Sequence, residues 1–259
     1  MAALDLDLAG HTALVCGASA GIGRETALIL AAHGARVVAL ARRRDRLEGL
    51  VDELSAVSES AAEFVVADLD DTAALQRAVS GVSATILINN TGGPPAGPLT
   101  EASPDALRSA FNRHVIGAQV LLQSMLPHMQ AAGYGRIINV LSTSVREPIP
   151  NLGVSNTIRG AMASWAKSLS KELGPGITIN NVLPGFTDTE RLASLKQAVA
   201  GRTGTSQEAV MQGWIGRVPE GRLGHPSELA GLIAFLVSPA GAYIRGQSVA
   251  VDGGRLNTI

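Results

Sequence analysis

The sequence contains one cysteine, few aromatic residues and almost no net charge. A single cysteine, Cys16, excludes a disulfide within the chain. Aromatic residues make up 3 % of the 259 residues, so Ala, Val, Ile and Leu must fill the hydrophobic core. The formal net charge of -1 provides no general attraction to the phosphates of nucleic acid, and we expect no nucleic-acid partner.

Long apolar runs and an apolar leader are missing as well. No run is long enough to span a bilayer, so no membrane association is expected. The N-terminal residues 1–8 lack the basic stretch and the following apolar stretch that are typical of a secretion signal. We therefore expect a cytoplasmic protein, and the sequence predicts no metal site.

Short apolar runs alternate with longer helical patterns over the whole chain. The predicted strands are 12–17, 36–41, 63–67, 85–89, 136–141, 178–183 and 247–251. The predicted helices are 22–33, 44–57, 72–79, 104–130, 154–173 and 226–237. Most strand candidates lack the alternation of a half-exposed strand, so we expect both faces of the sheet to be buried. The pattern predicts one α/β domain, residues 1–259, with a Rossmann-type doubly wound parallel sheet of seven strands flanked by helices.

The alternation breaks at residues 186–224, which are polar, contain several glycines and include Trp214. A long irregular segment directly after a strand often covers a site, and we interpret this one as a lid. A surface excursion and a subunit contact are the alternatives.

A glycine-rich turn follows the first strand and opens the first helix, and it runs from Gly17 through Ser19, Gly21 and Ile22 to Gly23. Gly17 permits the tight turn, Gly21 lets the backbone approach a pyrophosphate, and Gly23 lets helix and strand pack closely. Free N–H groups at the helix start then face the phosphates. An ordinary glycine-rich turn is the alternative, but the strand before it and the helix after it favour a dinucleotide site.

The second predicted strand ends without the acidic residue that usually binds the ribose hydroxyls of NAD. Arg42 and Arg43 follow it, and guanidinium groups suit the extra phosphate of NADP. A solvated basic helix start is the alternative, although cations are unfavourable at a helix N-terminus. The sequence therefore favours NADP over NAD.

Polar and small residues follow the third and fourth predicted strands. Asp68, followed by Leu69, can accept a hydrogen bond from the adenine amino group. Asn90, Thr91 and Gly92 end the fourth strand, where small residues let the backbone approach a cofactor. Both segments are also compatible with ordinary turn chemistry, since Asn, Asp and Gly favour turns.

Six motifs, in order, resemble those of the short-chain dehydrogenase/reductase family, especially its 3-oxoacyl-carrier-protein reductase branch. They are Gly17-x-x-x-Gly21-x-Gly23, Asn89-Asn90-Thr91-Gly92, Gly135-Arg136-Ile137-Ile138-Asn139, Pro184-Gly185-Phe186-Thr187-Asp188-Thr189, Gly221-Arg222-Leu223-Gly224 and Asp252-Gly253-Gly254. The resemblance covers nearly the whole chain. It implies that Pro184, Gly185 and Thr187 also contact the cofactor. Thr91 and Cys16 replace the alanine and threonine usual in the family, and both changes are small.

The resemblance also implies four catalytic groups, of which this chain keeps one. The family's serine corresponds to Ser142, its tyrosine to Ser155 and its lysine to Arg159. Its asparagine corresponds to His114, with Asn112 as a weaker candidate.

A shifted Tyr-x-x-x-Lys motif does not exist in this chain. The only tyrosines are Tyr134 and Tyr243, and neither is followed four residues later by lysine. The residues at positions 155 and 159 are therefore real substitutions.

The substitutions argue against the family's ordinary proton transfer. The hydroxyl of Ser155 is far too weak an acid to replace a phenol. Arg159 can bind ribose hydroxyls of the cofactor but stays protonated. His114 is expected to titrate near neutrality and is the best remaining proton donor, with a structural helix histidine as the alternative. Ser142 can orient a substrate oxygen or cap the end of a strand.

The sequence predicts an NADP-dependent oxidoreductase that moves hydride to or from a carbonyl or alcohol carbon of a small molecule by a non-standard proton path. The alternative is a nucleotide-binding sensor or partner subunit without dehydrogenase activity. An apolar stripe on the helix 154–173, formed by Ala161, Met162, Trp165 and Leu169, suits the two-fold contacts that the family uses. We expect a homotetramer, or a homodimer, while burial of this stripe against the chain's own sheet is the alternative.

Overall fold

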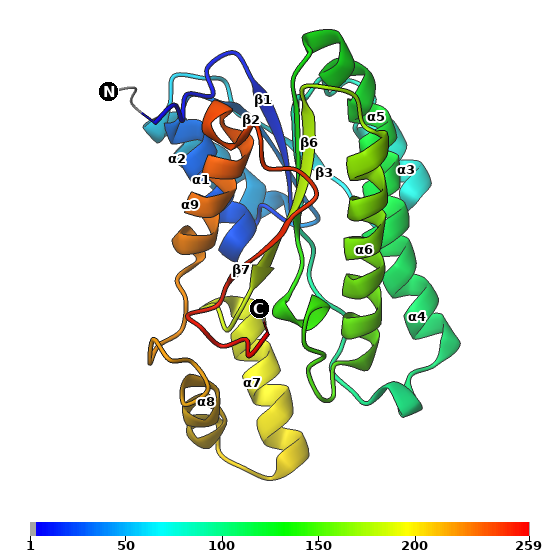
Figure 1. The fold of residues 1–259 in the computed structure, drawn as a ribbon, viewed down its shortest axis with the longest axis vertical. Helices are drawn as coiled ribbons and strands as arrows, with labels where there is room; N and C mark the ends of the chain where they lie inside the picture. Colours follow the sequence, from blue (N-terminus) through cyan, green and yellow to red (C-terminus); the bar gives the residue numbers. More distant parts are fainter. Residues whose placement is uncertain (1–3, 259) are drawn as a thin grey trace.

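A seven-stranded parallel sheet lies at the centre of the computed structural model, which describes residues 4–258 (Figure 1). The strands are β1 (Thr12–Cys16), β2 (Arg36–Ala41), β3 (Glu63–Val66), β4 (Ile86–Asn89), β5 (Gly135–Val140), β6 (Ile177–Pro184) and β7 (Ser248–Val251). Their order is β3-β2-β1-β4-β5-β6-β7, and all neighbours are parallel. The chain therefore winds outward from β1 to β3 and then outward on the other side from β4, which confirms the predicted doubly wound sheet.

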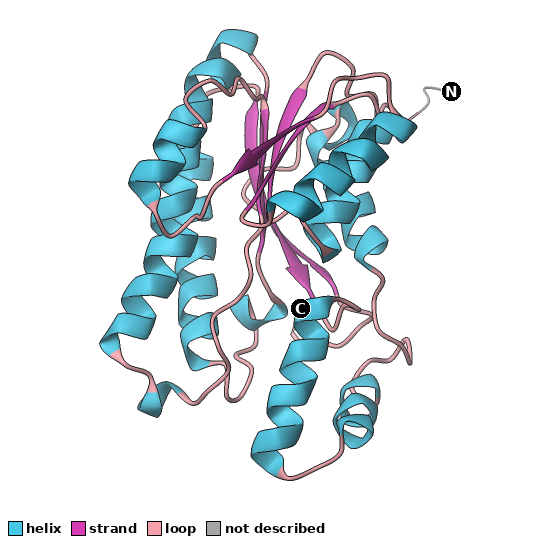
Figure 2. Ribbon diagram, turned by 180° about the vertical axis from the view of Figure 1, so that it is seen from behind, coloured by secondary structure: helices cyan, strands magenta, loops and turns pink. Residues whose placement is uncertain are grey.

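Helices cover both faces of this sheet. They are α1 (Gly21–Ala32), α2 (Arg44–Val57), α3 (Thr72–Ala78), α4 (Pro104–Phe111), α5 (Gly117–Ala132), α6 (Gly153–Glu172), α7 (Glu190–Thr203), α8 (Gln207–Ile215) and α9 (Pro226–Val237). Helices α1, α2 and α9 lie on one face and α3 to α6 on the other, as the two opposite views show (Figures 1 and 2). Between residues 4 and 258, no helix combines the length and the hydrophobicity of a membrane span. The N-terminal residues 1–3, part of the stretch without a secretion pattern, lie outside the described residues.

Successive side chains of the strands enter two different cores. On β1, Ala13 and Val15 pack with α1, α2 and α9, whereas Leu14 packs with α3, α5 and α6. All three side chains are buried, because helices cover the strand from both sides. This arrangement explains why the strands have continuous apolar sequences.

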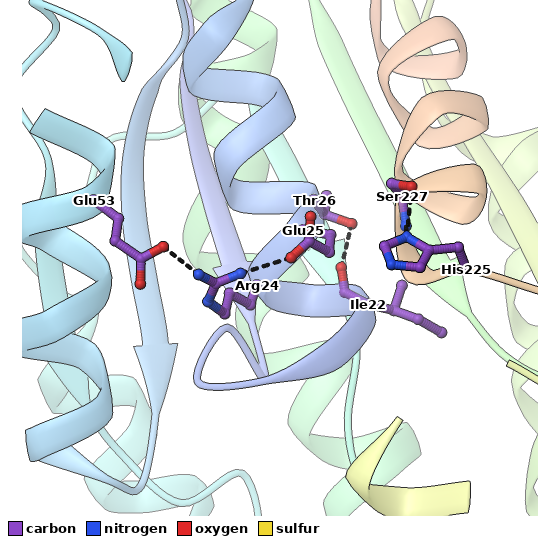
Figure 3. Close-up of polar contacts among 7 residues, drawn as sticks. All are labelled: Ile22, Arg24, Glu25, Thr26, Glu53, His225 and Ser227. Carbon is purple, nitrogen blue, oxygen red and sulfur yellow. Dashed lines mark hydrogen bonds and ion pairs between the residues drawn. The ribbon is translucent and has the colours of Figure 1, made fainter. Parts of the chain in front are cut away.

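Polar contacts join the start of α1 to α2, and similar contacts cap α9 (Figure 3). Arg24 forms ion pairs with Glu25 and with Glu53 of α2. At the start of α9, His225 Nδ1 lies 2.8 Å from Ser227 Oγ and also accepts from the Ser227 N–H. Such capping satisfies backbone groups that have no partner within the helix.

Side-chain amides connect the strands on one half of the sheet. Asn89 Nδ2 donates to Asn139 Oδ1, and Asn139 Nδ2 donates to Asn181 Oδ1, each at 2.9 Å. Asn181 Nδ2 then donates to Ser248 Oγ at 3.0 Å. These residues are direct register partners on β4, β5, β6 and β7. We call this row the asparagine ladder; it satisfies polar groups that the buried strands could not expose to water.

Two segments differ from the sequence-based expectation. The predicted helix 104–130 is divided by a π-helical turn, η2 (Asn112–Ile116), between α4 and α5. Segment 186–224 is not irregular, because it contains α7 and α8, which extend beyond the carboxyl ends of the strands (Figure 1). Apolar residues of these two helices, Leu192, Leu195 and Val199 of α7 and Trp214 of α8, line a cavity at those strand ends.

Candidate active site

A cavity of about 760 Å³ opens at the carboxyl ends of the strands. This is the edge of a doubly wound sheet at which ligands bind. All predicted nucleotide-binding residues except Gly23 line it, namely Gly17, Ser19, Gly21, Ile22, Arg42, Arg43, Asp68, Leu69, Asn90, Thr91, Gly92, Arg159, Pro184, Gly185 and Thr187. Ser142 and Ser155 line it as well. The fold thus brings residues from six loops around one volume.

The glycine-rich turn has the close packing that a dinucleotide site needs. Gly17 has a φ of +61°, and a Cβ there would lie 2.6 Å from Asn90 O. Gly23 lies behind the cavity, where a Cβ would come within 2.3 Å of Gly17 O. Ala20, which precedes α1, provides no side-chain cap, so the first N–H groups of the helix have no side-chain acceptor there. These features fit a bound pyrophosphate, because its oxygens would accept from those N–H groups.

Two arginines border the cavity where β2 ends. Arg43 Nη2 donates to Ser19 Oγ at 3.1 Å, which connects the end of β2 to the glycine-rich turn. Arg43 also lies 3.5 Å from a carboxylate oxygen of Glu190, and Arg42 lies 3.6 Å from one of Asp68. The four side chains are exposed, so these ion pairs are weak and leave the guanidinium groups accessible to a phosphate.

The turns after β3 and β4 combine cavity lining with ordinary turn chemistry. Asp68 Oδ1 accepts from the Asp70 N–H at 3.1 Å, which leaves the other carboxylate oxygen near Arg42. Asn90 Nδ2 lies 3.3 Å from Cys16 O and 3.4 Å from Gly17 O, and fixes the turn beside the glycine loop. The same residues therefore take part in turn chemistry and line the cavity, and their contact with a cofactor stays a prediction.

Ser155 and Arg159 lie one helical turn apart on α6. The Arg159 guanidinium is buried, and it donates to Val140 O at 2.8 Å and to Thr91 O at 3.2 Å. Burial, together with the charge of Arg191, lowers the pKa of Arg159 to about 10, so the side chain stays charged at neutral pH. Arg159 thus places a fixed positive charge at the ends of β4 and β5.

Ser142 begins the 3-10 turn η3 (Thr143–Val145), directly after β5. Its Oγ accepts from the Ser144 N–H at 3.1 Å and also lines the cavity. Ser142 therefore caps the turn and still presents its hydroxyl proton for donation to a ligand.

His114 lies in the π-helical turn, a type of irregularity that is frequent at functional sites. It is 4 % exposed and lines a second cavity of about 10 Å³ beside Arg159, which is large enough for one water molecule. Burial, followed by the charges of Arg159 and Arg113, lowers the pKa of His114 to about 2. The expectation that His114 titrates near neutrality is wrong, because a buried imidazolium would face two guanidinium groups.

Asn112, the weaker candidate for the family's asparagine, lines neither of these cavities. Its Nδ2 donates to Asp70 Oδ1 at 3.0 Å, and Asp70 also pairs with Arg113 at 3.1 Å. Asn112 therefore holds the start of the π-helical turn against the loop before α3.

Sequence reasoning missed Arg191, which enters the cavity from the first turn of α7. Its Nη2 donates to Pro94 O at 2.7 Å. A Cβ on Gly93 would lie 3.4 Å from that Nη2 and 3.9 Å from Ser155 Oγ, so the guanidinium and the hydroxyl converge beside Gly93. Arginines recur in segment 186–224, but only the tertiary structure shows that Arg191 is the one near position 155.

Comparisons with known proteins agree with this fold and cavity. The family model described as enoyl-(acyl carrier protein) reductase matches residues 17–255. L-xylulose reductase of Cavia porcellus is 34 % identical over 258 residues, which cover 98 % of this chain and 100 % of the relative.

Solved structures of reductases share this fold. L-sorbose reductase from Gluconobacter frateurii, complexed with NADPH and L-sorbose, has a TM-score of 0.91 at 27 % identity and covers 98 % of this chain and 100 % of its own. A 3-oxoacyl (acyl-carrier-protein) reductase from Agrobacterium tumefaciens with NADP bound has a TM-score of 0.86 at 25 % identity, over 96 % of this chain and 95 % of its own.

The strand order, the glycine-rich turn and the position of the cavity all agree with the resemblance seen in the six motifs. The family model matches most of the chain, and the similarity to L-xylulose reductase extends over nearly all of it. The chain belongs to the short-chain dehydrogenase/reductase family.

Proposed function

We propose that the protein is an NADP-dependent oxidoreductase that moves hydride between the cofactor and a carbonyl or alcohol carbon by a proton path different from the family's usual one. The observation that carries this proposal is the single cavity in which the glycine-rich turn, Arg43, Ser142, Ser155 and Arg159 meet. A nucleotide bound along the turn would reach the serines and Arg159 from one side, leaving the remaining volume for a substrate.

The cofactor is NADP. Arg42 and Arg43 provide two accessible guanidinium groups beside Ser19, where an extra ribose phosphate would lie. The similar L-sorbose reductase was crystallised with NADPH, and the similar 3-oxoacyl reductase with NADP. When bound, the nicotinamide supplies or accepts the hydride.

Ser155 and Arg159 take the positions of the family's tyrosine and lysine. Arg159 is held by two backbone carbonyl groups, so its charge is fixed before a ligand arrives. A fixed positive charge stabilises negative charge that develops on a substrate oxygen without reorganisation. Ser142 would donate its hydroxyl proton to the same oxygen, while Ser155 leaves the space that a phenol would fill.

The proton comes through water rather than from a titrating side chain. His114 is neutral at physiological pH, so it cannot act as an imidazolium acid. A neutral imidazole donates through one nitrogen and accepts through the other, and His114 borders a cavity of one-water size next to Arg159. His114 would therefore hold that water by a hydrogen bond, and the water would carry the proton between solvent and the substrate oxygen.

Two further parts of the proposal concern the lid and assembly. Segment 186–224 would close over bound ligands, since Arg43 and Arg46 connect the start of α7 to the region of α2 through Glu190. The apolar stripe on α6 is only partly available for assembly, because Met162 is buried in the chain's own core. The homotetramer remains a prediction.

The test combines cofactor binding with turnover. NADPH binding is followed by fluorescence, for the parent protein and for the double variant Arg42→Ala/Arg43→Ala. Loss of charge-assisted contacts worth about 1.5–3 kcal/mol each should weaken NADPH at least tenfold and leave NADH nearly unchanged. Equal weakening of the two cofactors would contradict the phosphate role.

Turnover is then measured with ketones, quinones and acyl thioesters. Oxidation of NADPH by any of them supports the enzyme. NADPH binding without oxidation by the whole panel would instead support a nucleotide sensor or a partner subunit. The neutral His114 and the missing phenol are the observations that favour this second candidate.

A further inference from the structure

We infer that the substrate half of the cavity binds an organic acid, with Arg191 as the principal contact of its carboxylate and an apolar wall around its carbon chain. The substrate half is the part lined by residues 93–96, 142–159 and 191–217, together with Phe186 and Arg255. The inference deepens the proposed function, because it names the class of molecule that would occupy the space beside the cofactor.

Positive charge dominates this half of the cavity. Five arginines line it: Arg159, Arg191, Arg202, Arg217 and Arg255. None of them forms an ion pair within 4.0 Å among residues 4–258. The acidic residues that line the cavity are Asp68 and Glu190, and both pair with arginines at the nucleotide rim. An anionic ligand would thus meet unpaired guanidinium groups in the substrate half.

Arg191 is placed for such a contact. Its bond to Pro94 O uses one N–H of the guanidinium, and no group within residues 4–258 accepts from the other four. Its Nη2 and Ser155 Oγ both lie within 4 Å of the Cβ position of Gly93. A carboxylate between them would accept from both.

The neighbouring charges make an anion favourable at this point. Arg191 contributes to the lowered pKa of Arg159, which places two positive charges near each other without an acid between them. A bound carboxylate would relieve this repulsion, and charge-assisted bonds from guanidinium to carboxylate are among the stronger polar contacts in proteins.

A second arginine joins the charged part of the pocket to an aromatic wall. Arg255 Nη1 donates to Thr143 Oγ1 at 2.6 Å, and its guanidinium lies 4.9 Å from the centre of the Phe186 ring. Phe186 in turn stacks on Trp214, with ring centres 5.2 Å apart. Glu147 and Asp252 partly offset the charge of Arg255, but neither comes within ion-pair distance of it.

The apolar residues of the substrate half indicate the chemistry of the ligand beyond its carboxylate. Ile149, Leu192, Leu195 and Val199 line the same part of the cavity. An inorganic anion would leave this apolar surface without a partner, whereas the hydrocarbon part of an organic acid would cover it. A carboxylate attached to an apolar body that carries the reacting carbonyl therefore fits both features.

The test measures binding rather than turnover. Calorimetric titrations compare 5-oxohexanoate, its methyl ester and inorganic phosphate, at constant ionic strength, with the protein alone and with the protein saturated with NADP+. We expect the oxo acid to bind at least tenfold more tightly than either the ester or phosphate, with and without the cofactor. Arg191→Gln should remove most of this preference, and Arg191→Lys should retain part of it. Arg77→Gln, on an exposed arginine of α3 outside the cavity, is the matched control and should behave like the parent.

Several results would overturn the inference. Equal binding of acid and ester, no binding of the acid, or an unchanged preference in Arg191→Gln would each exclude the carboxylate contact. Phosphate binding as tightly as the oxo acid would indicate a bare anion site. Loss of acid binding on saturation with NADP+ would mean that the arginines serve the cofactor's phosphates. If NADPH does not bind but the oxo acid does, the proposed function fails and this inference stands.

Discussion

Replacing His114 by asparagine tests the buried, uncharged state of this side chain. The pKa of His114 is lowered from its ordinary value of 6.5 to about 2 by burial and by the adjacent guanidinium groups. Because the folded-state value is the lower one, the unfolded chain binds the additional proton as the pH falls below 6.5. Protonation therefore favours unfolding, and the stabilisation by neutral His114 is complete above pH 6.5 and is lost between pH 6.5 and 2.

The size of the effect follows from the shift. Each pH unit below 6.5 costs about 1.4 kcal/mol as long as the folded-state histidine stays neutral. At pH 5 the single group should reduce the free energy of unfolding by about 2 kcal/mol relative to pH 7. Other groups also titrate in this range, so the meaningful quantity is the difference between parent and variant.

Urea unfolding at pH 7 and pH 5 provides the measurement. The parent should lose about 2 kcal/mol more stability between these pH values than His114→Asn does. The control is His128→Asn, which removes a partly exposed histidine of α5 and should keep the loss seen in the parent. Equal losses in the parent and in His114→Asn, or an NMR titration of His114 near pH 6.5, would refute the reasoning.

Three further predictions concern the glycine turn, the altered catalytic pair and assembly. Gly23→Ala would place a Cβ 2.3 Å from Gly17 O. Urea unfolding should then show a free energy of unfolding lower by about 1–3 kcal/mol, and titration should show weaker NADPH binding. The control is Gly231→Ala on α9, which should not lower the stability, because among residues 4–258 a Cβ there would meet no atom within 4 Å beyond the adjacent residues and the helix backbone. The double variant Ser155→Tyr/Arg159→Lys should increase the rate of carbonyl reduction by a factor on the order of 10²–10⁴. Each single change should increase it by less, because the phenol needs the neighbouring ammonium to lower its pKa. If the double variant binds NADPH normally but reduces carbonyls no faster, substrate fit is the barrier. Light scattering at micromolar concentration should show a tetramer, and a monomer would exclude the expected two-fold contacts.

The regular elements of this fold could be predicted because their sequences are locally unambiguous. The bounds predicted for β2, α2 and α9 agree with the structure at both ends. For β2 the apolar run is uninterrupted, and it ends where the arginines begin. The π-helical turn could not be predicted, since it is confined to residues 112–116 and so short a segment has no apolar period of its own to read from the sequence.

The candidate site could be predicted only where its chemistry depends on neighbours in the chain. The glycine turn and Arg43 follow from local sequence, and the structure places both at the cavity. The state of His114 depends on Arg159, forty-five residues away on another helix, and its burial cannot be read from the helix pattern alone. The position of Arg191 beside Ser155 likewise depends on how α7 returns over the strand ends.

The asparagine ladder fixes the register of the strands, and the positions of the cavity residues depend on that register. Thr91, Ser142 and Pro184 follow its asparagines by two or three residues, and they line the cavity. A slip of one residue would move such positions by about 3.3 Å and turn each side chain to the opposite face. It would also leave buried amides unpaired, at about 1–3 kcal/mol for each lost partner.

The geometry of the pocket therefore depends on the register of the strands. A change to one amide of the ladder requires matched changes in the adjacent strands. The segments outside the sheet, where the arginines of the substrate half lie, take no part in the ladder. New specificities can thus arise there while the sheet below retains its alignment.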